Sequence, residues 1–366
     1  MNIHLKFYYR YKKYIKLLRI ILFKKPLLIP RIIYNYFRIL VFKERVVRKI
    51  EIGITFDCQC NCAKCSSIFM RDVGREVVTP DELTQFGKDI IKLGVVHLNL
   101  TGGEPLLAER FFEIVKSLQP HKVLITVNTN GLLLSDRMID MLEQAGVDII
   151  KISIDSPIAE EHDKSRGYVG CFSQAIKALS YIKQKRRILA QISTVCIKEN
   201  LNSERIWKLV KMANDYNALL GLTIPAASGR WMNAEGILLG EQEREVLKKL
   251  IRIPHVIRDT DEAYLRSHCP AGSEELYLTC YGDVIPCPLI QISFGNIKNE
   301  RIGSIWKKMS DFKRFKHKQK FGCLAGEDRD FIKKYLTPLK SYSHLPLAIE
   351  NHPANADDAD ASEKDT

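Results

Sequence analysis

The sequence predicts an α/β protein built on a partial TIM-like barrel of six strand–helix units. A basic helical segment precedes this barrel and a small cysteine-rich extension follows it. Short apolar runs alternate with longer amphipathic segments from about residue 50 to residue 225, a pattern typical of parallel strands joined by helices. The basic residues concentrate before this region, and cysteine, glycine and proline punctuate the sequence after about residue 265.

The N-terminal segment, residues 1–48, differs from the rest in charge. Residues 1–50 contain 14 Lys and Arg and one acidic residue, Glu44, so they carry the whole net charge of +13. Two apolar and basic stretches, Leu5–Phe23 and Ile32–Phe42, each fall short of the ~20 uninterrupted apolar residues of a membrane span. One interpretation is an amphipathic hairpin on anionic lipid, and the other is a helical cap on the barrel. The concentration of charge favours lipid.

The remaining chain is electrically balanced, which excludes a charge-driven nucleic-acid interface on the body of the protein. No secretory signal is recognisable, because basic residues interrupt the apolar stretches at the start of the sequence. Clustered cysteines without such a signal are typical of metal ligands in a reducing compartment. We therefore expect a cytoplasmic protein that could lie peripherally at a membrane surface.

The barrel is expected to span residues 49–255. Its first helix begins with Thr79 as N-cap and Pro80 at the first helical position, followed by Asp81 and Glu82, which favour a helix N-terminus. The predicted strands are 50–56, 95–101, 123–128, 149–154, 188–197 and 219–225, and the predicted helices are 80–93, 109–118, 135–145, 171–185 and 203–216.

Four cysteines follow the first predicted strand, at the carboxyl end of the barrel where barrel enzymes place their chemistry. Cys58, Cys62 and Cys65 have the spacing C-x3-C-x2-C. Three thiolates on one loop would leave one iron of a [4Fe–4S] cluster open for a further ligand. With Cys60, the four thiols could instead form a closed zinc site.

Three further motifs follow the next three strands: Gly102-Gly103-Glu104-Pro105, Asn128-Thr129-Asn130-Gly131 and Ser153-Ile154-Asp155-Ser156. In this order, after the cysteine loop, they resemble the radical S-adenosylmethionine (SAM) superfamily. The resemblance implies that Cys58, Cys62 and Cys65 bind the catalytic cluster. It further implies that SAM is bound by Gly102, Gly103, Glu104, Ser153, Asp155 and Arg166. In the family, the glycine–glutamate turn binds the amino group of SAM and the arginine binds its carboxylate. Lys64 departs from the family, which often has an aromatic residue there.

The extension, residues 256–340, begins with Cys269 and Cys287 in the pattern C-x12-G-x4-C. It resembles a truncated SPASM or twitch domain, which implies an auxiliary [4Fe–4S] cluster on Cys269, Cys287 and Cys323. Cys280 is the fourth ligand by count, or else a small buried apolar residue, the interpretation we prefer for Cys171 and Cys196. We expect the region of these ligands, residues 269–323, to form a lobe of its own. The tail, residues 341–366, is expected to be disordered at its acidic end.

The resemblance implies reductive cleavage of SAM to a 5′-deoxyadenosyl radical, which takes hydrogen from a peptide or a small molecule, carbohydrate- and lipid-linked molecules included. It also implies a flavodoxin- or ferredoxin-like electron donor. The alternatives are a non-catalytic iron–sulfur electron-transfer or metal-binding protein and a zinc-stabilised interaction module. Neither alternative accounts for the Gly-Gly-Glu-Pro turn.

Overall fold

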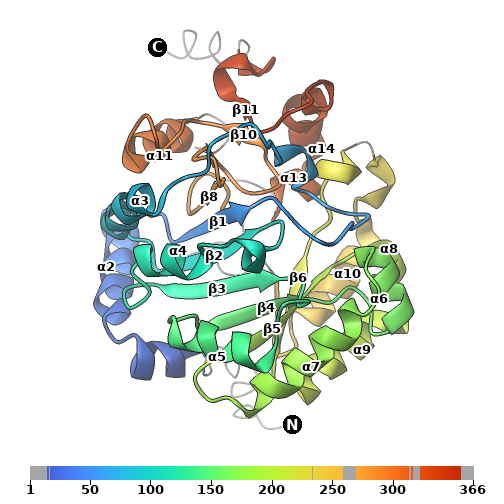
Figure 1. The fold of residues 1–366 in the computed structure, drawn as a ribbon. Coiled ribbons are helices and arrows are strands. Elements are labelled where there is room, and N and C mark those ends of the chain that lie inside the picture. Colours follow the sequence, from blue (N-terminus) through green and yellow to red (C-terminus); the bar gives the residue numbers. More distant parts are fainter. Residues whose placement is uncertain are drawn as a thin grey trace.

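The computed structural model describes residues 15, 17–232, 234–258, 269–312, 315 and 322–355. Its core is a nine-stranded sheet in the order β7-β6-β5-β4-β3-β2-β1-β8-β9 (Figure 1). All neighbours are parallel except β8 and β9. The strands are β1 (Lys49–Thr55), β2 (His97–Gly102), β3 (Leu124–Thr129), β4 (Ile149–Ser153), β5 (Leu189–Val195), β6 (Leu219–Thr223), β7 (Val256–Arg258), β8 (Glu275–Leu278) and β9 (Val284–Ile285), with a separate pair of β10 (Ile292–Ser293) and β11 (Leu347–Ala348).

Helices connect successive strands of the barrel (Figure 1). The helix α3 begins as predicted, with Thr79 and Glu82 forming a reciprocal capping box, and ends at Gly94 in a left-handed conformation. The α-helices are α2 (Leu28–Leu40), α3 (Pro80–Leu93), α4 (Phe111–Ser117), α5 (Asp136–Gln144), α6 (Ala159–Arg166), α7 (Cys171–Gln184), α8 (Lys198–Leu201), α9 (Glu204–Asp215), α10 (Glu241–Leu250), α11 (Ile302–Asp311), α13 (Leu324–Glu327) and α14 (Arg329–Phe331).

The six predicted strands correspond to β1–β6, and each boundary lies within two residues of the predicted one. The predicted partial barrel is thereby confirmed. The sequence did not predict β7, which follows β6 at one edge of the sheet, or β8, which lies between β1 and the other edge strand, β9. Both are too short, at three and four residues, to produce a recognisable periodicity.

The cysteine-rich extension does not form a separate lobe, contrary to our expectation. Its strand β8 pairs in parallel with β1, with Lys49 opposite Glu275 and Ile52 opposite Leu278. Tyr277 on β8 is buried, and its hydroxyl occupies the space that a Cβ at Gly53 would need, 2.4 Å away. The extension is therefore part of the barrel sheet, and its cysteines are positioned from the same backbone as the first cysteine loop.

The N-terminal segment closes the amino-terminal end of the barrel. Residues 17–24 are helical, and Ile20, Ile21 and Leu28 pack in one cluster with residues at the amino-terminal ends of the strands. The strand-end residues of this cluster are Val96, Leu124, Ile149, Leu189 and Leu219. The interpretation as a helical cap is thus correct for the side of the described segment that packs on the strand ends. The concentration of basic residues in the sequence had favoured the other interpretation, a hairpin on lipid. The predictions for residues 1–14 and for the acidic end, residues 356–366, lie outside the described residues.

Lys25 anchors this cap electrostatically. Its Nζ donates to the carbonyl oxygens of Val123, at 2.6 Å, and Gly146, at 3.0 Å, and pairs with the buried carboxylate of Asp148. Burial lowers the pKa of Lys25 to about 8, although Asp148 opposes that shift. Within the described residues, no helix is both long and apolar enough to cross a membrane.

Replacing Lys25 by Met should lower the free energy of unfolding by about 3 kcal/mol, because it leaves the Asp148 carboxylate buried with less compensation. Lys24→Met is the matched control. Its Nζ is 3.1 Å from the other oxygen of Asp148, but its side chain is 22% exposed, so the loss should be under about 1 kcal/mol. Urea unfolding measures both. Equal, small losses would show that the cap is not docked through Lys25.

Candidate active site

A cavity of about 840 Å³ opens among the strands and carries both groups of cysteines on its walls. Its lining includes the loops that follow β1 to β4, together with residues of the extension. The cysteines that line it are Cys58, Cys60, Cys62, Cys65, Cys269, Cys287 and Cys323. The structure therefore brings together two groups that are about 200 residues apart in the sequence.

Cys60 lies among the other thiols of the first loop. Its thiol contacts with Cys171, the largest cause, and with Cys58 and Cys62 raise the pKa of Cys60. These contacts lower the pKa of Cys58 to about 7 and that of Cys62 to about 6, the latter also under the charge of Arg166. Cys60 thus keeps its proton while its neighbours favour the thiolate, the form that binds metal.

The cysteine loop is held from one side by the end of α6. The amide of Asn61 donates to the carbonyl of Arg166 at 3.0 Å, and the amide of Ala63 donates to the carbonyl of Ser165 at 3.2 Å. Gly167 follows with a φ of +63°, and a Cβ there would lie 2.7 Å from the carbonyl oxygen of Asn61. A glycine at this position therefore permits the close approach of helix end and loop.

A second element, the turn after β6, holds the loop from another side. The guanidinium of Arg230 donates to the carbonyl of Cys62 at 2.8 Å and of Asn61 at 3.2 Å, and its amide donates to the carbonyl of Cys65 at 3.0 Å. From the extension, Gln291 donates to the carbonyl of Ser66 at 2.7 Å. Sequence reasoning missed both residues. The only available signal for Arg230 was its place after the sixth strand.

The two glycines of the Gly-Gly-Glu-Pro turn pack against the first strand. A Cβ at Gly102 would lie 2.1 Å from the carbonyl oxygen of Thr55, and a Cβ at Gly103 would lie 2.2 Å from that of Asp57. The resemblance implies that both glycines bind SAM. Both line the cavity, but the steric need for glycine comes from the strand beside them.

Glu104, which follows the two glycines, is held by hydrogen bonds within the protein. Its side chain is fully buried and is not among the groups that line the cavity. Its carboxylate accepts from the amide of Asn130 at 2.8 Å, the hydroxyl of Thr129 at 2.8 Å and the amide of Leu106 at 3.2 Å. Burial raises the pKa of Glu104 to about 7, although the three hydrogen bonds act to lower it. The residue joins the turn after β2 to the turn after β3, and so positions both.

Asp155 forms a buried ionic cluster at the end of β4. Its carboxylate is 2.5 Å from the ammonium of Lys64 and 2.8 Å from the guanidinium of Arg166. Burial alone would raise the pKa of Asp155, but the charges of Arg166 and Lys64 outweigh it and hold that pKa well below its usual range. All three side chains line the cavity, as does Ser153. Lys64, the departure from the family pattern, therefore fixes the carboxylate.

The three later cysteines face one another across the cavity. Burial raises the pKa of each thiol, to about 11 for Cys269, and the charges of Cys269 and Cys323 raise that of Cys287 further. Backbone amides oppose that rise in the pKa, those of Ala271 and Leu324 at Cys269, that of Leu289 at Cys287 and that of Gly326 at Cys323. Amides directed at sulfur are the hydrogen bonds that tune a thiolate-held cluster.

Cys280, the predicted fourth ligand by count, does not line the cavity with this group. It is buried at the turn after β8, where its carbonyl accepts from the amide of Val78 at 2.7 Å. Cys196 is buried in the core, and Cys171 is also buried, its thiol 3.4 Å from the carbonyl oxygen of Asn130.

The donor sets suit iron–sulfur clusters better than single ions. Within the described ranges, no three His, Cys, Asp or Glu side chains converge as the ligands of one metal ion would. A zinc ion needs its thiolates about 2.3 Å from one point. A four-iron cluster is held at its corners, so its ligands lie further apart. Each group offers three thiols, and the pKa values of Cys58 and Cys62 are lowered toward the thiolate form that binds iron.

Comparison with known families agrees with this geometry. Residues 52–213 match the model of the Radical SAM superfamily, and residues 269–325 match the SPASM model, an iron–sulfur cluster-binding domain. An AdoMet-dependent heme synthase of Methanosarcina barkeri is 26% identical over 74% of this chain and 84% of the relative. The mycofactocin maturase MftC of Mycolicibacterium smegmatis is 28% identical over 83% of this chain and 84% of the relative.

Solved structures show the same fold at low sequence identity. SuiB of Streptococcus suis, bound to its precursor peptide SuiA, aligns with a TM-score of 0.60 at 14% identity, over 76% of this chain and 67% of SuiB. The structure of anSMEcpe with bound AdoMet aligns with a TM-score of 0.56 at 17% identity, over 80% of this chain and 88% of that one. The partial barrel and its extension are thus a known architecture.

Glu104→Ala should destabilise the fold by about 1–3 kcal/mol, because three donors lose their acceptor inside the protein. We expect weaker SAM binding only as a consequence of the displaced turn. Asp81→Ala, in the first turn of α3, removes an acid whose side chain takes no part in the α3 capping box and serves as control. Urea unfolding and SAM titration measure the two effects. Weaker SAM binding with unchanged stability would place the Glu104 carboxylate at the ligand instead.

Proposed function

Because the chain belongs to the radical SAM superfamily and carries a SPASM domain, we propose that it performs a radical reaction on a substrate held in the cavity. The radical SAM domain implies a [4Fe–4S] cluster and SAM as cofactors, and the SPASM domain implies an auxiliary iron–sulfur cluster. When bound, the first cluster supplies the electron that cleaves SAM to methionine and a 5′-deoxyadenosyl radical, which takes a hydrogen atom from the substrate.

One observation carries this proposal: the thiols of both cysteine groups line the same cavity. We assign Cys58, Cys62 and Cys65 to the first cluster, with the fourth iron open to SAM. Cys60 is not assigned as a ligand, in keeping with the raised pKa of Cys60. Ordering the reactants within one enclosed space is the main contribution that a protein makes to such chemistry.

The residues around the cysteine loop bind and orient SAM. Gly102, Gly103 and Ser153 contribute to the wall of the cavity, as do Asp155 and Arg166. We propose that the guanidinium of Arg166 directs its remaining donors at the SAM carboxylate, a pairing suited to its planar shape. Asp155 holds that guanidinium in place through its 2.8 Å contact. Glu104 acts indirectly, by fixing the turn that carries the two glycines.

The auxiliary cluster is assigned to Cys269, Cys287 and Cys323, which leaves one of its irons without a cysteine. The position of these thiols in the same cavity supports a role for this cluster as a ligand of the substrate or as an electron relay. The first electron needs a low-potential donor, for which a flavodoxin- or ferredoxin-like protein is the expected class.

The substrate class is a peptide or a small molecule. The solved structure of SuiB with a precursor peptide supports a peptide, and the name of the heme synthase supports a small molecule. The cavity volume of about 840 Å³ is at the upper end of the range for small-ligand sites, and it must hold SAM as well as the reacting part of the substrate. Any larger part of a peptide would therefore lie outside it.

Replacing Cys58, Cys62 or Cys65 by Ala should abolish 5′-deoxyadenosine formation from SAM, because each change removes one of three ligands. Cys60→Ala is the matched control and should retain activity. The measurement is the amount of 5′-deoxyadenosine released by anaerobically reconstituted, reduced protein.

If Cys60→Ala is inactive while Cys62→Ala is active, the assignment of ligands is wrong. If the wild-type protein binds iron and sulfide but neither binds nor cleaves SAM, the electron-transfer alternative is correct. Zinc without iron would favour the interaction module.

A further inference from the structure

The helix α2 is apolar on two opposite sides. One side faces the barrel, where Leu28 and Ile39 are buried. The other side carries Ile33, Phe37 and Leu40, at the i, i+4 and i+7 positions of a stripe, and these are 64%, 47% and 51% exposed. A helix with apolar side chains on two opposite sides is normally covered on both of them. In the part of the chain that the structure describes, nothing buries the outer stripe.

Other exposed apolar side chains are concentrated in the same part of the chain, the described residues of 15–42, which we call the outer face. Twelve of the 22 exposed large apolar side chains in the described part of the chain belong to it. They are Ile15, Leu18, Leu22, Phe23, Leu27, Ile33, Tyr34, Tyr36, Phe37, Leu40, Val41 and Phe42. An exposed apolar patch of this kind marks an interaction site.

Charge identifies the partner. Residues 1–19 contain six Lys and Arg and no acidic residue, and also four tyrosines. Cations attract an anionic lipid surface, while tyrosine favours the boundary between headgroups and hydrocarbon. A second copy of the chain is a poorer partner. A two-fold interface would bring the same patch of both protomers together, and with it two segments of the same strong positive charge.

We propose that the outer face binds the surface of an anionic lipid bilayer, with its apolar side chains in the interfacial layer, and that the excess basic charge of the N-terminal segment attracts it to that surface. The Lys25–Asp148 pair and the packing on the strand ends then join this membrane-bound face rigidly to the barrel. The inference does not depend on the proposed function, since it rests on residues outside the cavity.

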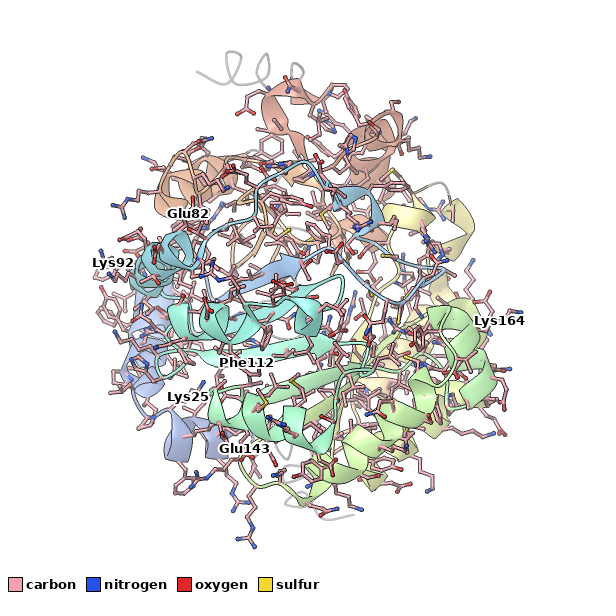
Figure 2. The ribbon with its side chains drawn as sticks, in the orientation of Figure 1. Lys25, Glu82, Lys92, Phe112, Glu143 and Lys164 are labelled. Atoms are coloured by element: carbon pink, nitrogen blue, oxygen red, sulfur yellow. The ribbon has the colours of Figure 1, made fainter. Side chains whose placement is uncertain are left out.

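The geometry also gives the orientation of the enzyme. The cap contacts the amino-terminal ends of the strands, and the cysteine loop follows the carboxyl end of β1. In Figure 1, α2 lies at the opposite end of the strands from the arrowhead of β3. Lys25 in the cap and Lys164 on α6, the helix whose end holds the cysteine loop, lie on opposite sides of the molecule in Figure 2. The cavity would thus face away from the bilayer, toward soluble substrates and the electron donor, and not toward a lipid-linked substrate in the same membrane.

The test is co-sedimentation of the full-length, reconstituted protein with vesicles. Vesicles of phosphatidylglycerol and phosphatidylcholine are compared with vesicles of phosphatidylcholine alone. We expect the wild-type protein to bind the anionic vesicles, and salt to weaken that binding. Ile33→Asp/Phe37→Asp should weaken binding about tenfold or more, because it removes two apolar side chains from the interface.

The control is Trp207→Asp on α9, which places one acid at an exposed aromatic position. Trp207 is 45% exposed and Phe37 is 47% exposed, so the two sites are closely matched. Binding of this control should remain that of the wild type. Ile33→Ser/Phe37→Ser provides a second, uncharged variant, so that a folding defect of the first does not decide the result. Circular dichroism and 5′-deoxyadenosine formation without vesicles should be unchanged in all variants.

Three results would overturn the proposal. The wild-type protein could fail to sediment with anionic vesicles, or both outer-face variants could bind as the wild type does. Alternatively, the wild-type protein could be a dimer without vesicles and the variants monomers, which would assign the outer face to a second copy. If the wild-type protein forms no 5′-deoxyadenosine, the proposed function is contradicted. The vesicle-binding result would still decide the membrane proposal, because the two measurements are independent.

Discussion

The position of the loop that carries Cys58, Cys62 and Cys65 is the constraint on which the site depends. Between β1 and the short helical turn at Ile68, the loop has no regular structure to fix it. Its backbone is held instead by the end of α6, by Arg230 after β6 and by Gln291 of the extension. Elements from most of the chain must therefore be in place before the three thiols face the cavity together. This dependence explains why the extension continues the barrel sheet through β8.

Buried charge serves the same purpose as these backbone bonds. Arg166 contributes its carbonyl to the loop backbone, its guanidinium to Asp155 and a donor 3.9 Å from the sulfur of Cys62. In a poorly solvated site, such contacts are stronger than at a surface, and a missing partner is correspondingly costly. Lys64 places a second cation on the carboxylate of Asp155.

The sequence predicted those strands and helices that are determined by residues within the element itself. The strands β1–β6 follow from apolar runs, and α3 follows from the cap at Thr79. The placement of Glu104 could not be predicted, because its three donors come from another strand's turn and from its own. Arg230 acts across the barrel on a loop 165 or more residues away, and β8 pairs with the first strand of the barrel. The charge of residues 1–50 suggested lipid, but it could not reveal that Lys25 is buried on Asp148.

The central claim is that a cluster on Cys58, Cys62 and Cys65 binds SAM directly at one iron. Electron paramagnetic resonance of the reduced, anaerobically reconstituted protein tests it most directly. The account predicts that SAM changes the signal of one cluster and leaves that of the auxiliary cluster unchanged. In Cys62→Ala, the SAM-responsive signal should be absent and the other should persist. A spectrum that SAM does not alter, from protein with full iron content, would contradict the account.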